Sequence, residues 1–69
     1  MSIYAKRVSK NLRKMIIASD KSSEKVAQGA GVAKATISNY LKGKRTPTIP
    51  ILEKIADYLK RDFQDFFKP

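Results

Sequence analysis

The residues best suited to a chemical role are cationic and amide side chains on a short predicted helix, residues 34–42. Ile37 and Leu41 are four residues apart, so both would face the protein core. The remaining positions form an outer face, made of Lys34, Ala35, Ser38, Asn39 and Lys42. Cations and amides on the outer face of a helix can hydrogen-bond to DNA base edges and phosphates.

Individual side chains on this face fit individual bases. Lys34 can donate to guanine O6 and N7, Asn39 can pair with adenine N6 and N7, and Ala35 can touch a thymine methyl group. We therefore expect base contacts from Lys34, Ala35, Ser38 and Asn39. The alternative for Lys34 and Asn39 is a solvated helix face with no partner.

Phosphate contacts are expected around the same helix. Lys42, Lys44 and Arg45 lie at or just past its end, where backbone contacts would fix the register of the protein on DNA. Thr36 can bind a phosphate or simply bond back within the helix. Ser23 lies near the start of the preceding helix, where a phosphate contact and a capping role are both open.

Two short helices position these residues. Val26 and Ala30 are four residues apart and predict a first helix, which Ser22 would cap. Gly31 follows, and a glycine after a helical run supplies the positive φ that ends a helix at low cost. The sequence therefore predicts a helix, a tight turn at Gly31 and a second helix.

The rest of the chain predicts three more helices. Residues 3–18 form an amphipathic pattern, Thr48 precedes a helix with a broad apolar face, and Asp62 precedes a short helix over 63–67. The expected fold is all-α, a compact bundle of five short helices that contains a helix-turn-helix. Residues 1–69 are expected to form one domain.

Composition excludes several function classes. The chain has no cysteine and no histidine, so we expect no disulfide, metal or cofactor, and no catalytic constellation is evident. No apolar run approaches the roughly 18 residues that span a bilayer, and bases interrupt the N-terminal region, so we expect neither a membrane association nor a signal peptide. We expect a cytoplasmic protein, not an enzyme.

The net charge of +9 is unevenly distributed. Residues 1–21 carry six bases and one acid, residues 22–45 carry five bases and one acid, and residues 46–69 carry four of each. A basic surface on a small domain favours nucleic acid as a partner. A generic cationic surface and a membrane-active peptide are the alternatives, although several short helices do not make one long amphipathic helix.

The chain resembles the helix-turn-helix family of phage repressors and Cro proteins. The resemblance rests on Val26-Ala27, Ala30-Gly31-Val32, Thr36-Ile37-Ser38 and the segment 43–47, which reads Gly-Lys-Arg-Thr-Pro. It implies a bacterial or phage-encoded, nucleoid-associated regulator of transcription that binds duplex DNA, with repression as the expected effect.

One departure from the family pattern concerns Arg13. The family commonly pairs an arginine there with a glutamate near the end of the recognition helix, and this chain has Leu41 at that position. We therefore expect Arg13 to point to solvent or to a phosphate.

Other functions stay open at this stage. An antitoxin would use the same DNA site and a second surface for a toxin. RNA binding would call for stacking aromatic residues, but the phenylalanines lie in the neutral last third. A bare scaffold domain would show no salt-dependent affinity for DNA.

A homodimer is expected, formed in solution or only on DNA, because one short helix reads few base pairs. Phe63 and Phe67 are four residues apart and would pack inward together. Phe66 is therefore the expected exposed dimer contact, unless it also enters the core.

Overall fold

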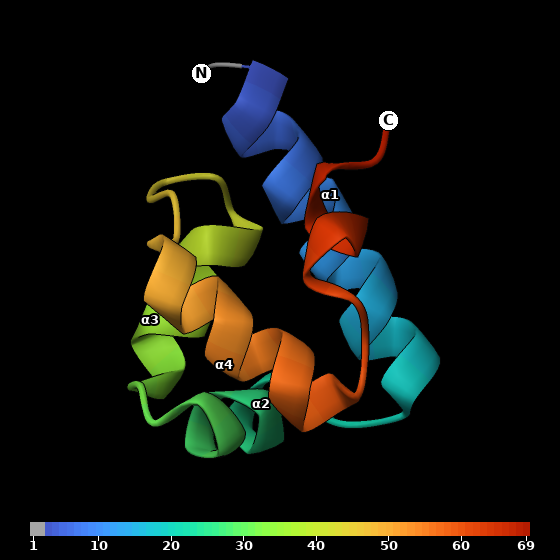
Figure 1. The fold of residues 1–69 in the computed structure, drawn as a ribbon. Coiled ribbons are helices and arrows are strands. Elements are labelled where there is room, and N and C mark those ends of the chain that lie inside the picture. The colour runs from blue at the N-terminus through green and yellow to red at the C-terminus, as the bar shows by residue number, and fades with distance from the viewer. Residues whose placement is uncertain (1–2) are drawn as a thin grey trace.

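The computed structural model describes residues 3–69 and contains only helical elements in that range. They are α1 (Ile3–Ser19), α2 (Ser23–Ala30), α3 (Lys34–Leu41), α4 (Ile49–Leu59) and the 3-10 helix η1 (Phe63–Phe67). Figure 1 shows α1 on one side of the molecule, α2, α3 and α4 on the other, and the C-terminal segment running back along α1. The predicted all-α bundle is confirmed.

A single apolar core joins these helices. It contains side chains from every element, and the largest fully buried ones are Leu12, Ile37, Leu52, Ile55 and Phe66. Full burial of one such side chain stabilises a fold by about 1.5–3 kcal/mol. The two helices of the helix-turn-helix therefore pack on each other and on α4 and α1, while η1 packs on α1 and α4.

The prediction that Phe66 is exposed is wrong. Phe66 is completely buried, whereas Phe63 and Phe67 are only half-buried. The prediction assumed α-helical spacing, but η1 is a 3-10 helix, in which residues three apart share a face. The Phe63 ring meets the Phe66 ring edge to face, with centroids 6.3 Å apart, and it also meets the Phe67 ring at 5.2 Å, so the predicted contact between Phe63 and Phe67 forms. Phe66 is thus a core residue and cannot be an exposed dimer contact.

A buried amide on α1 holds the C-terminal segment in place. Asn11 Nδ2 donates to the carbonyl oxygens of Phe66 and Lys68, at 2.8 Å in each case. The Tyr4 ring adds a stacked contact with the Phe67 ring, at 5.5 Å between centroids. These contacts explain why a five-residue 3-10 helix occupies a fixed place against α1.

Close packing of α2 on α4 explains a glycine inside α2. The Tyr58 ring lies directly against Gly29, and a Cβ atom built on Gly29 would come within 2.3 Å of Tyr58 Cδ1. Glycine inside a helix costs about 0.5–1 kcal/mol relative to alanine. Here its lack of a side chain lets α4 approach α2.

The turn between α2 and α3 forms as the sequence predicts. Gly31 has φ +71, its N–H donates to Gln28 O, and the N–H of Val32 donates to Ala27 O. This pair of hydrogen bonds is a Schellman motif, which requires a left-handed residue at its centre. At the other end of α2, Ser22 Oγ accepts from the Lys25 N–H at 3.1 Å, which confirms the predicted cap.

A matched pair of substitutions tests the left-handed positions. α4 ends in the same hydrogen-bond pattern, but its left-handed residue is Lys60 with φ +57. In this conformation a non-glycine residue lowers the stability of the fold by roughly 1–2 kcal/mol. Gly31→Val should therefore lower the free energy of unfolding by more than about 1 kcal/mol, and Lys60→Gly should raise it by roughly 0.5–1 kcal/mol.

Thermal melting measures both effects, since about 1 kcal/mol shifts the Tm of a domain this small by roughly 4–8 °C. A Cβ at Gly31 would meet no atom within 4 Å, so the loss for Gly31→Val reports the backbone and not a clash. An unchanged Tm for Gly31→Val would contradict this account of the turn.

Candidate nucleic-acid interface

The outer face of α3 carries the side chains that the sequence singled out. Lys34 and Ala35 are exposed, while Thr36, Ser38 and Asn39 are half-buried. Ile37 and Tyr40 point the other way, into the core. The structure thus brings the predicted base-contacting residues together on one surface, and their contacts with DNA stay predictions.

The start of α3 has no side-chain cap. Ala33 lies in the extended region and offers no side-chain acceptor to the first turn. Its carbonyl instead accepts from the N–H groups of Thr36 and Ile37, at 3.0 and 3.4 Å. No side-chain oxygen therefore screens the positive end of the helix dipole at the first turn of α3.

The end of α3 fixes the position of the basic loop. Gly43 has φ +75, its N–H donates to Tyr40 O, and the N–H of Lys44 donates to Asn39 O at 2.9 Å. This second Schellman motif holds the backbone of Lys44 against the last turn of the helix. The side chains of Lys42, Lys44 and Arg45 are all exposed. The helix ends at Leu41, one residue before the predicted bound.

The last carbonyl of α3 is bound by two side chains of α1. Ser9 Oγ donates to Leu41 O at 3.0 Å, and Arg13 Nη2 donates to the same oxygen at 2.9 Å. The terminal carbonyls of a helix lack intrahelical partners and carry partial negative charge, so a cation there is favourable. Arg13 is exposed to solvent as predicted, but its guanidinium also binds this backbone carbonyl, a partner that the sequence did not predict.

An ion pair crosses the turn between the two short helices. Lys34 Nζ lies 3.9 Å from Glu24 Oε2, and the two side chains are 69% and 59% exposed. Sequence reasoning missed Glu24, because ten positions separate the two residues and only the turn geometry brings them together. The pair joins the predicted base-contacting Lys34 to the first turn of α2.

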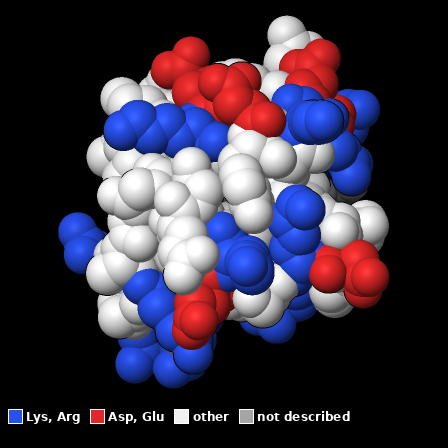
Figure 2. All heavy atoms as spheres, turned by 90° about the horizontal axis from the view of Figure 1, so that it is seen from below, with Lys and Arg blue, Asp and Glu red and all other residues white. Residues whose placement is uncertain are grey.

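Surface charge is mixed on the face seen from below in Figure 1. Figure 2 shows Lys and Arg side chains in the middle of this face and at its edges, separated by uncharged side chains, with acidic side chains at the top, the right and the lower part of the same face. The basic excess of the first two-thirds of the sequence is therefore not gathered into one continuous patch on this face. Binding of a polyanion would therefore depend on the positions of individual Lys and Arg side chains and not on one continuous basic surface.

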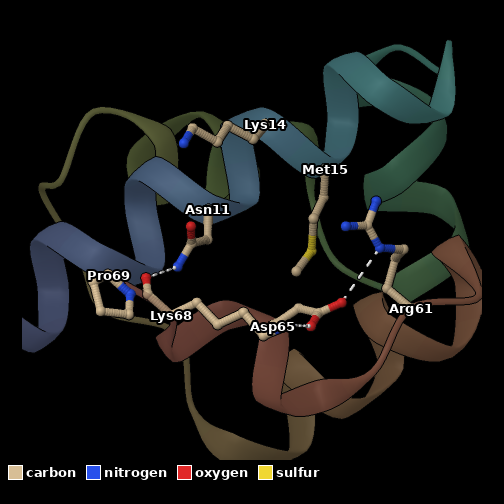
Figure 3. A pocket seen from close by; sticks show the side chains of 7 residues that line it. All are labelled: Asn11, Lys14, Met15, Arg61, Asp65, Lys68 and Pro69. Carbon is tan, nitrogen blue, oxygen red and sulfur yellow. Dashed lines mark hydrogen bonds and ion pairs between the residues drawn. The ribbon is translucent and has the colours of Figure 1, made fainter.

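The structure also has a pocket of about 260 Å³ between α1 and the C-terminal segment. Figure 3 shows the side chains that line it, which are Asn11, Lys14, Met15, Arg61, Asp65, Lys68 and Pro69. Asp65 forms ion pairs with Arg61 at 3.4 Å and with Lys68 at 2.8 Å.

Asp65 is paired with two of the three cations that line this pocket. The hydrogen bond from Lys68 holds the pKa of the Asp65 carboxyl below its usual value, against a smaller opposing effect of burial, and the same bond raises the pKa of Lys68. Asp65 therefore stays ionised, and an anion entering the pocket would compete with it for both cations.

Two other site classes find no support in the residues that the structure describes. No group of three or more Asp, Glu, His or Cys side chains lies close enough to hold a metal ion among residues 3–69. Within the same range, no helix is both long and apolar enough to span a bilayer.

The anchoring of α3 can be tested through Leu41 O. Ser9→Ala should lower the free energy of unfolding by about 0.5–1.5 kcal/mol through the lost hydrogen bond. Arg13→Met should lower it by roughly 0.3–1 kcal/mol through the lost cation at the helix end. Because both donors share one acceptor, either one partly compensates for loss of the other, and the double variant should lose more than the sum of the single variants. Denaturant titration measures all three.

Lys10→Met is the matched control, since it removes an exposed cation from the same helix. If Lys10→Met costs as much as Arg13→Met, then Arg13 acts only through overall charge and the anchoring account fails.

Comparison with known proteins agrees with this geometry. The helix-turn-helix family model HTH_3 matches residues 5–66. No curated protein matches the chain. The crystal structure of an HTH_3 family transcriptional regulator from Vibrio cholerae superimposes with a TM-score of 0.87 at 31% sequence identity, covering 94% of this chain and 36% of that one. This chain thus spans little more than a third of that regulator. The family resemblance seen in the sequence is confirmed, and the chain belongs to the HTH_3 helix-turn-helix family.

Proposed function

We propose that this chain binds duplex DNA sequence-specifically by placing α3 in the major groove, and that it acts as a transcriptional repressor. The observation that carries the proposal is the outer face of α3, where Lys34, Ala35 and Asn39 lie together on a helix whose other face is anchored in the core. Helix-turn-helix proteins use the second helix of the motif in this way.

The dimensions of α3 support the proposal. Eight residues at 1.5 Å each give a rod of about 12 Å, which matches a major groove about 12 Å wide. The residues at the start of the helix, Lys34 and Ala35, are the most exposed part of its polar face. In this arrangement Lys34, Ala35, Ser38 and Asn39 contact bases.

Contacts with the DNA backbone come from residues at the ends of the two helices of the motif. Lys44 and Arg45 follow α3 directly, and Lys42 ends it, so their cations lie where phosphates flank the groove. Ser23 and Thr36 are half-buried hydroxyls near the first turns of α2 and α3, and we assign them to phosphates as well. Ser23 is free for this role because Ser22 supplies the cap of α2.

A homodimer on a two-fold symmetric site completes the proposal. Two recognition helices about 34 Å apart would read two half-sites on one face of DNA. Phe66 takes no part in the contact between subunits, because it is buried. We propose that the dimer forms in solution or on DNA, in the cytoplasm where duplex DNA is available.

An antitoxin that represses its own operon would use the same DNA surface and hold a toxin on another. Purification of the tagged protein from its native host separates the two functions. A stoichiometric protein partner would favour the antitoxin, and a preparation with no second protein favours the repressor.

Selection of bound sequences from random duplex DNA tests the proposed function. The wild-type protein should select a two-fold symmetric consensus. Asn39→Ala and Lys34→Ala should each relax the preference at one position per half-site, since a bidentate base contact is worth about 1–3 kcal/mol of discrimination. No enrichment would contradict the proposal, and an unchanged consensus in both variants would place base readout elsewhere on the chain.

Salt dependence tests the backbone contacts separately. If each subunit neutralises about five phosphates, log K should fall with log salt at a slope of roughly −4 to −5 per subunit. Lys44→Ala or Arg45→Ala should reduce this slope by about one and weaken binding to selected and scrambled duplexes alike. Lys54→Ala removes an exposed cation of α4 and should leave the slope nearly unchanged. An affinity that is independent of salt would contradict DNA binding.

A further inference from the structure

We propose that Glu24 is a specificity-determining residue, and that the Glu24–Lys34 ion pair reads a G·C base pair as a unit. This inference rests on the proposed function, because it assumes that α3 lies in the major groove. It adds Glu24 of α2 to the proposed base-contacting residues of α3, and it names the base pair that Glu24 and Lys34 select.

The geometry places a donor and an acceptor side by side on the exposed surface. Lys34 Nζ and Glu24 Oε2 are 3.9 Å apart, and both side chains are more than half exposed. Lys34 is the first residue of α3, and Glu24 is in the first turn of α2. The turn at Gly31 therefore brings the starts of the two helices together.

An ion pair this exposed contributes little to folding. Neither partner is held by a second ion pair among the described residues. Glu24 also has a structural role open to it, since an acid in the first turn of a helix is stabilised by the helix dipole. That role needs a negative charge at Glu24 but does not need Lys34, so the two roles can be separated.

The major-groove edge of a G·C pair complements this ion pair. Guanine O6 and N7 accept hydrogen bonds, which the Lys34 ammonium can donate, and cytosine N4 donates one, which the Glu24 carboxylate can accept. An A·T pair reverses part of this pattern, because adenine N6 is a donor and thymine O4 an acceptor. The pair would thus favour G·C in one orientation.

Glu24 also opposes binding to DNA of the wrong sequence. It is the one acidic residue in the segment 22–45, which otherwise carries five bases. Its carboxylate lies at the predicted interface, where it repels phosphates, and it competes with them for the Lys34 ammonium. Without a cytosine to bind, this charge is uncompensated, so sequence-independent affinity falls.

Glu24→Gln is the direct test, with Glu53→Gln as the matched control. Glu53 is an exposed acid on α4, outside the helix-turn-helix, so both variants lose one negative charge. Affinity is measured by titration for three kinds of duplex: the consensus selected from random DNA, a series in which each G·C pair of a half-site is changed in turn to A·T, and a scrambled duplex. Thermal melting of each variant shows that it is folded.

For the wild-type protein, one G·C to A·T change should weaken binding by about 10-fold or more. Glu24→Gln should reduce that penalty by at least about 3-fold and tighten binding to the scrambled duplex by about 3-fold, while Glu53→Gln should leave the penalty unchanged. When Lys34→Ala is already present, adding Glu24→Gln should not reduce the preference for G·C over A·T any further, because the Glu24–Lys34 ion pair is already lost.

Three results would overturn the inference. They are equal effects of Glu24→Gln and Glu53→Gln on all duplexes, an unchanged G·C preference in Glu24→Gln, and a Glu24→Gln effect that persists in full without Lys34. In each of these results the wild type still binds its consensus, so the proposed function stands. A wild-type protein that binds none of the duplexes would overturn the proposed function and this inference with it.

Discussion

Helix α3 depends on the rest of the molecule for its position, because eight residues are too few to form a stable helix alone in water. Ile37 and Tyr40 fix its inner face in the core, and Ser9 and Arg13 of α1 bind the carbonyl of Leu41 at its end. The outer face is left with little freedom to rotate. Placement of Lys34 and Asn39 on a defined surface follows from these anchors.

The elements around α3 have different structural roles. α1, α4 and η1 supply most of the core, and Asn11 ties the C-terminal segment to α1. In that region Asp65 forms ion pairs with Arg61 and Lys68. At the motif, Lys42, Lys44 and Arg45 are exposed, and none of them forms an ion pair with another of the described residues. These three cations are free to bind phosphate, as are exposed cations elsewhere such as Lys10 and Lys54, so only their position beside α3 sets them apart.

Much of the fold could be predicted from sequence because its signals are local. The turn at Gly31 and the caps at Ser22 and Thr48 each depend on a few neighbouring residues, and the structure confirms them. The features that sequence reasoning missed have a different physical origin. α-Helical spacing predicts that Phe66 is exposed, but its segment is a 3-10 helix. Arg13 binds a backbone carbonyl, and because every residue offers such an acceptor, no sequence pattern reveals this contact. Glu24 meets Lys34 only through the turn geometry.

The central claim is that the outer face of α3, with the loop that follows it, is the DNA-binding surface. Nuclear magnetic resonance of the labelled protein, titrated with the selected duplex, tests it most directly because it maps contacts residue by residue. The account predicts that backbone amide shifts change most over residues 22–25 and 33–46, and least in η1 and the second half of α4. Shift changes centred on the pocket between α1 and the C-terminal segment, with α3 unaffected, would contradict it.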